Sequence, residues 1–211
     1  MKSRFLLFCY MVYYALLVYS LICAPSLSIR SIVLSVVAAI LYLLPVLLER
    51  LTPLVFPPLI KLFSVTFVFL CVYLGGVLYL YETLSYWDKI IHLISGLLLS
   101  TIVLALIPVC TGSIDVLRRI RPVCLVLVLI ACSTALGLFW EYLEFVCDLL
   151  FHLGLQMNKN LFPAENNSLL DTMTDLLAAQ VGSILMGCYY GRVVSKEKWL
   201  SLEKVIIQKQ K

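Results

Sequence analysis

Residues 90–109 read IIHLISGLLLSTIVLALIPV and contain no aspartate, glutamate, lysine or arginine. About 20 mainly apolar residues are what an α-helix needs to cross a bilayer. Further runs of this kind are residues 5–23, 31–48, 59–81, 122–147 and 170–191. Because backbone polar groups in hydrocarbon must be satisfied within their own segment, these runs predict helices. We therefore expect an all-α, polytopic membrane bundle of about six transmembrane helices.

The composition agrees with this fold class. Hydrophobic residues make up 63% of the 211 residues and charged residues 13%, whereas a soluble domain is typically about 45–50% apolar and about 25% charged. This excludes a soluble single-core protein, and the abundance of apolar side chains excludes a disordered chain. The eight cysteines form no CxxC pair, so neither a disulfide framework nor a thiolate metal site is expected.

The basic residues predict the orientation, because cytoplasmic segments carry an excess of lysine and arginine. If both termini are cytoplasmic, only Arg30, Lys89 and Lys159 of the 16 basic residues lie on the outer side. We therefore expect residues 1–191 to form an N-in, C-in transmembrane domain. Residues 192–211 would be a basic cytoplasmic tail, either an interfacial helix or a plain topology signal. The RRIR run at residues 118–121 is read as a topology signal, so no nucleic-acid partner is expected.

Acidic residues gather at the predicted outer ends of three spans. Their spacing places Asp88 with His92 on one helix face, Glu141 with Glu144 and Asp148 on a second, and Asp171 with Asp175 on a third. A charge inside a span costs at least about 2.5–3.5 kcal/mol on insertion scales, so such residues usually face the bundle interior. The simplest arrangement has the three faces pointing at one another.

Several of these acids also have an ordinary structural reading. Asp88 and Asp171 could cap the starts of their helices, and Asp148 could lie in the following loop. His152, Glu82 and Glu165 read as solvated loop residues. The loop over residues 149–169 reads equally well as a lid and as a plain connector.

The sixth span adds a stripe of small residues that continues the spacing of its acids: Ala179, Ser183, Gly187 and Gly191. Small residues four apart permit close helix approach. This places Asp175 in the bundle interior. Gly96 and Gly137 are candidate close contacts on the fourth and fifth spans.

A set of carboxylates with one imidazole suits a divalent cation: Mg²⁺, Mn²⁺ or Ca²⁺, or Zn²⁺ if histidine binds directly. The candidate ligands are Asp88, His92, Glu141, Glu144, Asp171 and Asp175. The candidate catalytic groups are His92, Glu141 and Asp175, with His92 as ligand or general base. Lys89 could neutralise one carboxylate, and a proton relay with one acid kept protonated is the alternative.

Three segments together resemble a known family, over about residues 80–191. They are WDKIIH at residues 87–92, WEYLEF at residues 140–145 followed by Asp148, and DTMTDL at residues 171–176 followed by Gly182. In this order they resemble the YjdF-like family of bacterial inner-membrane proteins. The resemblance implies a multi-pass protein of the bacterial cytoplasmic membrane and a site pattern, but no reaction.

A looser resemblance is to VanZ-like proteins, which are named for a role in glycopeptide resistance. Asp88, Lys89, His92, Glu141, Asp175 and Gly182 match that pattern. Glu144 stands where that family has glutamine, and Ala179 where it has asparagine. These departures argue for a shared helix scaffold rather than a VanZ-type function.

Three functions fit the pattern. The first is an integral-membrane enzyme with an outer-face site that acts on a lipid headgroup or lipid-linked envelope precursor. The second is a cation- or proton-coupled transporter, although the inner halves of the last three spans are nearly all apolar and there is no internal repeat. The third is a non-catalytic membrane scaffold or assembly factor.

Overall fold

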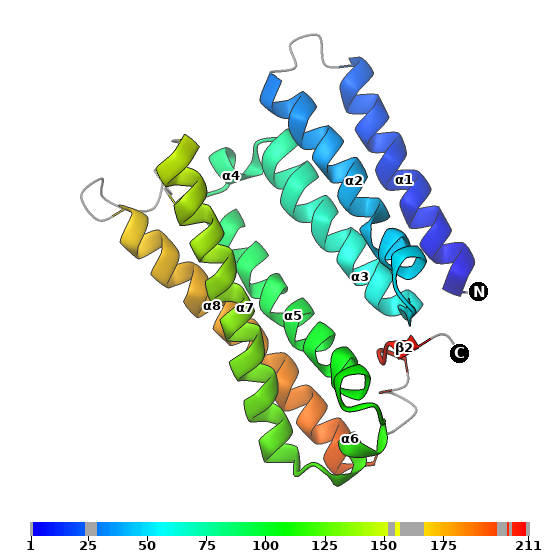
Figure 1. Ribbon diagram of the computed structural model, residues 1–211. Coiled ribbons are helices and arrows are strands. Elements are labelled where there is room, and N and C mark those ends of the chain that lie inside the picture. The colour runs from blue at the N-terminus through cyan, green and yellow to red at the C-terminus, as the bar shows by residue number, and fades with distance from the viewer. Residues whose placement is uncertain are drawn as a thin grey trace.

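The computed structural model describes residues 2–23, 29–151, 155–156, 167–197, 202 and 204–209. Its elements are, in chain order, α1 (Lys2–Cys23), α2 (Ile29–Leu51), β1 (Leu54–Val55), α3 (Pro58–Val68), the π-helix η1 (Phe69–Val77), α4 (Leu80–Thr83), α5 (Trp87–Thr111), α6 (Asp115–Arg119), α7 (Pro122–Phe151), α8 (Asn167–Ser195) and β2 (Gln208–Lys209). The described chain is almost entirely helical, so the all-α fold class is confirmed (Figure 1).

Five described helical segments are long and apolar enough to cross a membrane: Ser31–Leu51, Pro58–Val77, Trp87–Thr111, Pro122–Leu150 and Asn167–Ser195. The remaining predicted span is also helical, in α1, but its apolar described stretch, Arg4–Tyr19, is shorter. The predicted membrane helical bundle is therefore confirmed. Helices α5 and α8 begin before the apolar runs that predicted them, because α5 starts with Asp88 and Lys89 and α8 with the polar pair Asn167 and Ser168, and these residues lower the local hydropathy.

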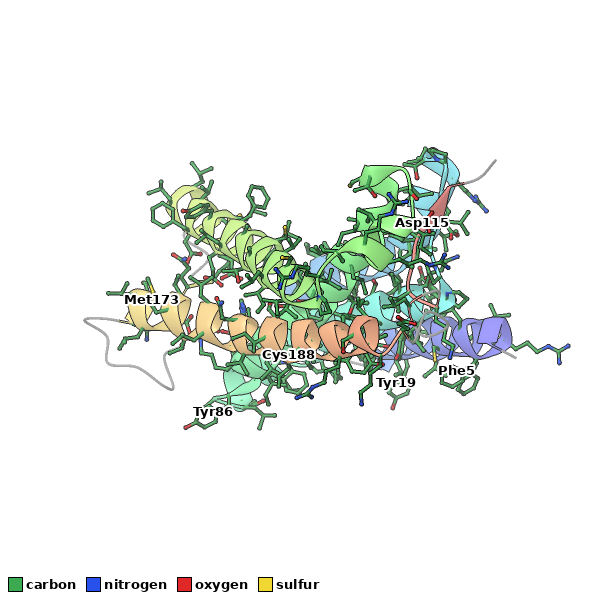
Figure 2. All side chains as sticks on the ribbon, turned by 90° about the horizontal axis from the view of Figure 1, so that it is seen from below. Phe5, Tyr19, Tyr86, Asp115, Met173 and Cys188 are labelled. Carbon is green, nitrogen blue, oxygen red and sulfur yellow. The ribbon has the colours of Figure 1, made fainter. Side chains whose placement is uncertain are left out.

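Large apolar side chains cover the outside of the bundle. Phe5, Tyr19 and Met173 are labelled examples that are exposed (Figure 2). Soluble monomers rarely expose contiguous apolar surface larger than a few hundred Å². The outward faces of these helices are suited to lipid.

The helices form two groups, which lie side by side (Figure 1). The N-terminal half consists of α1, α2, α3 and η1, and its core contains Leu17, Tyr42 and Val65. Tyr13 stacks on Phe69 in this half, with ring centroids 4.5 Å apart. The C-terminal half consists of α5, α7 and α8, in which α8 packs against both of the others. The halves meet mainly where α5 contacts α3 and η1.

Helices α5 and α8 approach so closely that only glycine fits at two crossing points. A methyl group on Gly96 would collide with the backbone of Ala179, and one on Gly182 with the carbonyl of Leu93. The small-residue stripe of α8 is buried on the same side as Asp175, as its spacing predicts. Gly137 makes no such close contact, because a methyl group there would lie 4.0 Å from the Ala179 side chain.

The end of the chain packs onto the bundle instead of lying free. Strand β2 pairs antiparallel with β1, with Leu54 opposite Lys209, and the amide of Ile207 donates to the carbonyl of Ala105 at 3.3 Å. Val205, Ile206 and Ile207 are buried in the same core as Leu117 and Leu125. Residues 204–209 are not helical, and the apolar side chains of Val205, Ile206 and Ile207 pack into this core. Trp199 lies outside the described residues.

The position of the packed tail shows at which end of the bundle the described chain ends. The start of α1 and strand β2 lie at the same end of the bundle (Figure 1). Arg118 and Arg119 lie in α6, at the opposite end of α5 from Asp88. The N-in, C-in orientation remains a prediction from the charge distribution.

Candidate metal centre

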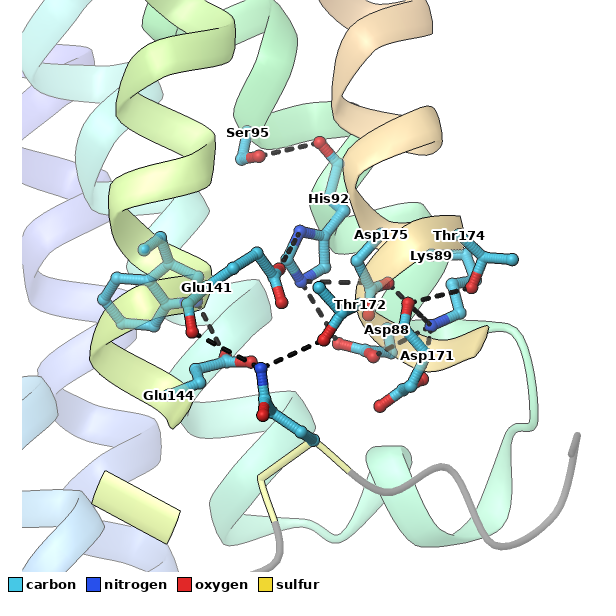
Figure 3. A network of polar contacts seen from close by, with 12 residues as sticks. Asp88, Lys89, His92, Ser95, Glu141, Glu144, Asp171, Thr172, Thr174 and Asp175 are labelled. Atoms are coloured by element: carbon cyan, nitrogen blue, oxygen red, sulfur yellow. Dashed lines mark hydrogen bonds and ion pairs between the residues drawn. The ribbon is translucent and has the colours of Figure 1, made fainter. Parts of the chain in front are cut away.

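The polar residues predicted to converge come from three helix ends that meet (Figure 3). Asp88, Lys89 and His92 lie in the first two turns of α5, Glu141 and Glu144 near the end of α7, and Asp171 and Asp175 near the start of α8. The close packing of α5 on α8 sets the positions of the first and third groups. Neither predicted helix cap is realised: Asp88 makes no capping hydrogen bond at the start of α5, and Asp171 lies a full turn inside α8.

Lys89 is the positive charge of this cluster. Its Nζ lies 2.5 Å from Asp171 Oδ1, 2.7 Å from Asp175 Oδ1 and 3.5 Å from Asp88 Oδ2. It also donates to the backbone carbonyl of Asp171 at 3.4 Å. The side chains of Asp171 and Asp175 are almost fully buried. A buried carboxylate is costly unless it is paired, so Lys89 makes the close approach of α5 and α8 electrostatically tolerable.

His92 lies at the centre of the acids and faces them with both ring nitrogens. Its Nε2 is 3.7 Å from Asp88 Oδ1 and 3.8 Å from Asp175 Oδ1, and its Nδ1 is 3.7 Å from Glu141 Oε1. One ligand atom each from Asp88, His92 and Asp175 lie within 4.8 Å of one another. These three residues are positioned to share one small cation.

Glu141 is the least compensated charge in the cluster. Its side chain is turned toward His92 (Figure 3), the residue is only 2% exposed, and neither carboxylate oxygen accepts a hydrogen bond of ordinary geometry. A buried polar group left unsatisfied costs about 1–3 kcal/mol, and more when it is charged. The position is therefore unfavourable for folding unless something else, such as a nearby cation, offsets it.

The other acids of the three predicted helix faces have different partners. Glu144 Oε1 accepts a hydrogen bond from Trp140 Nε1 at 2.7 Å, and Asp171 is held by Lys89. Asp148 accepts backbone hydrogen bonds from Leu155 at 2.8 Å and from Gln156 at 2.9 Å. Asp148 therefore fixes the turn that follows α7 and does not join the cluster.

We expect Asp148→Ala to destabilise the protein only modestly. A hydrogen bond to a charged group contributes about 1.5–3 kcal/mol, and these two are exposed or part-buried, so the loss should stay near the lower value. None of the groups around His92 is touched. Thermal unfolding in detergent should show a small decrease in midpoint, and metal affinity should stay close to that of the wild type. A loss of metal binding at full folding would place Asp148 in the site after all.

Two residues of the network had no signal in the sequence. The side chain of Gln156 donates from Nε2 to Thr172 Oγ1 at 3.0 Å and to the carbonyl of Glu141 at 3.4 Å. It thereby connects the C-terminal part of α7 with the N-terminal part of α8. An uncharged residue in a loop carries no periodicity that would have identified it. His152, Glu165 and most of the predicted lid, residues 157–166, lie outside the described residues.

A cavity of about 1000 Å³ adjoins the cluster. Asp88, His92, Glu144 and Asp171 contribute to its lining, together with apolar side chains of α2, α3, η1, α5 and α7. The cluster is therefore open to a space large enough for a ligand.

Residues 5–196 match the family described as "Predicted membrane protein (DUF2238)". The chain belongs to this family. Membership of DUF2238 and the apolar helices agree that this is a multi-pass membrane protein in contact with the lipid bilayer. No curated protein and no solved structure matches the chain significantly. The segment matched to DUF2238 includes every residue of the cluster, and the DUF2238 description states no activity.

Proposed function

We propose that this protein binds a divalent cation at Asp88, His92 and Asp175 and acts as a membrane enzyme on a lipid or lipid-linked substrate. The observation that carries the proposal is the pair formed by His92 and Glu141. Because His92 Nε2 faces two carboxylates, it can act as the ligand, and Nδ1 is then free to donate to Glu141. A metal-bound histidine almost always donates its other N–H to a carboxylate, a carbonyl or water.

Lys89 occupies part of the space that a cation would need. Its Nζ contacts Asp175 Oδ1, the oxygen that also faces His92. Without a metal the ammonium supplies the positive charge, and with a metal it would withdraw toward Asp171. The long, flexible lysine side chain permits this exchange at little cost.

The chemistry of such a site suits a phosphate group. Carboxylates and one imidazole hold hard or borderline cations, and a bound cation can polarise a phosphoryl oxygen and lower the pKa of bound water. The predicted topology places the site at the outer membrane surface, where lipid headgroups and lipid-linked envelope precursors lie. Hydrolysis or transfer at the phosphate of such a lipid is the reaction class that we propose, in a bacterial cytoplasmic membrane.

A cation- or proton-coupled transporter is less well supported. Transport would require polar groups that continue from the cluster toward the inner side. The polar groups that the structure describes there form separate contacts: Thr134 donates to Gln180, Ser183 to the carbonyl of Ala179, Ser100 to Ser133, and Tyr190 to Thr101. A scaffold function would leave the buried charge of Glu141 without a role.

The test is divalent-cation binding by the detergent-purified full chain, compared with Glu141→Gln. Calorimetric titration with Mg²⁺, Mn²⁺, Ca²⁺ and Zn²⁺ should show one stoichiometric site in the wild type. Glu141 would accept a hydrogen bond from the metal ligand His92 without touching the metal. Loss of such a residue typically weakens metal affinity about 10–100-fold, and we expect this decrease for Glu141→Gln. The metal-free variant should also unfold at a higher temperature than the metal-free wild type, since it removes a buried carboxylate whose oxygens accept no hydrogen bond.

Glu144→Gln is the matched control, because glutamine can still accept the hydrogen bond from Trp140. It should bind metal as the wild type does and should not gain the stability of Glu141→Gln. Absence of stoichiometric binding in the wild type would refute the proposed function. Equal binding in wild type and Glu141→Gln would refute the role given to Glu141.

A further inference from the structure

The cavity next to the cluster has one polar end and one apolar end. The polar end carries Asp88, His92 and Glu144. The rest of the wall is hydrocarbon, with Leu34 and Leu41 from α2, Phe67 from α3 and Leu98 from α5. Such a division suits a molecule with a polar head and an apolar chain.

The cavity is also open along the side of the bundle. Val37 on α2 and Leu136 and Trp140 on α7 line it, yet they are 38%, 43% and 50% exposed. These apolar residues belong to the two halves of the molecule, which pack on each other mainly through α5. The opening therefore lies between α2 and α7, on a surface suited to lipid, and it extends to the outer end, where Glu82 and Leu155 also line the cavity.

We propose that this cavity holds the hydrocarbon chain of a phosphate-bearing membrane lipid, which enters sideways from the bilayer between α2 and α7. The inference deepens the proposed function and rests on it for the polar end, where the head would meet the cation site. An aqueous substrate has no need of an apolar wall or of an opening toward lipid. The volume is at the upper end of the roughly 300–1,000 Å³ of ordinary ligand sites, as an elongated chain requires.

Leu98 can report whether a chain occupies the cavity. It lines the wall but is only 5% exposed, so bilayer lipid outside the bundle does not reach it. The full chain would be placed in nanodiscs that contain phosphatidylglycerol with a photoreactive diazirine in its acyl chain. After illumination, mass spectrometry should find adducts on the segment that contains Leu98. Adducts at the outward-facing Leu177, which is exposed, provide the reference for ordinary bilayer contact.

The variant that tests the opening is Leu136→Trp, which places a large ring at the opening. The ratio of labelling at Leu98 to labelling at Leu177 should fall about tenfold. This corresponds to a binding of the acyl chain that is weaker by about 1.4 kcal/mol. Leu138→Trp is the matched control, because Leu138 is exposed on the same helix but does not line the cavity. Both variants change lipid-facing positions, and both should bind the divalent cation as the wild type does.

The outcomes separate the two proposals. Labelling at Leu177 without labelling at Leu98 in the wild type would overturn the lipid cavity and leave the cation site standing. Labelling at Leu98 that Leu136→Trp does not reduce would overturn the opening between α2 and α7. Labelling at Leu98 in a protein that binds no divalent cation would support the lipid cavity and overturn the proposed function.

Discussion

Asp175→Asn is expected to abolish divalent-cation binding while the protein still folds. Asp175 is one of the three residues whose ligand atoms lie within 4.8 Å of one another, and it is almost fully buried on α8. Asparagine has nearly the same shape but lacks the negative charge that attracts a cation. The affinity for the divalent cation should fall by more than the roughly 10–100-fold that is typical when a residue behind a metal ligand is changed.

The fold should survive because Lys89 keeps a second buried partner. Its Nζ lies 2.5 Å from Asp171 Oδ1, so the substitution does not leave the ammonium unpaired. Metal should then stabilise the wild type alone: at a concentration 100 times the dissociation constant the gain is about 2.7 kcal/mol. Thermal unfolding with Mn²⁺ or with a chelator measures this difference directly.

Asp115→Asn is the control for a general effect of removing an acid. Asp115 lies in α6 at the other end of the bundle, where it is exposed and contacts Arg118. Exposed ion pairs contribute little, about 0–1 kcal/mol. Its metal response should match that of the wild type. Metal binding that persists unchanged in Asp175→Asn would contradict the assignment of Asp175 as a ligand.

Gly182→Ala is expected to produce the largest loss of stability among single-methyl changes in the described part of α8. The added methyl group would run into the carbonyl of Leu93 on α5, and a backbone atom cannot rotate away. Overpacking ordinarily lowers the free energy of unfolding by about 1–3 kcal/mol. Because the contacting atom belongs to the backbone, we expect Gly182→Ala to lose about 3 kcal/mol or more. Separating α5 from α8 would also move Lys89 away from Asp175, so metal binding should weaken as well.

Gly137→Ala is the matched control, with the same change on α7. Its methyl group would lie 4.0 Å from the Ala179 side chain, which is an ordinary contact. Since alanine favours a helix over glycine by about 1 kcal/mol, this variant should be neutral or somewhat more stable. Chemical or thermal unfolding in detergent compares the pair. Equal stability of the two variants would contradict the close packing of α5 on α8.

The membrane helices and the cluster face could be predicted because both depend on local properties. Hydropathy over about 20 residues indicates a span, and a spacing of four places Asp171 and Asp175 on one face whatever the neighbouring helices do. The stripe from Ala179 to Gly191 extended that prediction to the bundle interior. The starts of α5 and α8 were predicted too late, since the charged or polar residues in their first turns lower the hydropathy there.

The roles of individual acids could not be predicted. Glu141 and Glu144 lie three residues apart on one helix, yet one is buried against His92 and the other bonds to Trp140. Asp171 was a predicted ligand and Asp148 only a member of a predicted acidic face; Asp171 pairs with Lys89, and Asp148 accepts backbone hydrogen bonds from Leu155 and Gln156. Partner choice depends on the rotation of each helix, which for α5 and α8 is constrained by their crossing at Gly96 and Gly182.

The all-α membrane bundle and the three helix faces that carry the acids follow from the amino-acid sequence, because length, hydropathy and helical spacing act within single segments. Which acids surround His92, how Lys89 compensates them, and where the cavity between the halves opens depend on the packing of the helices against one another. The position of Ile206 and Ile207 in the core depends on it as well. These features arise from contacts between segments that are far apart in the chain. The geometry of such contacts depends on how the helices pack, which the spacing of residues within one segment does not determine.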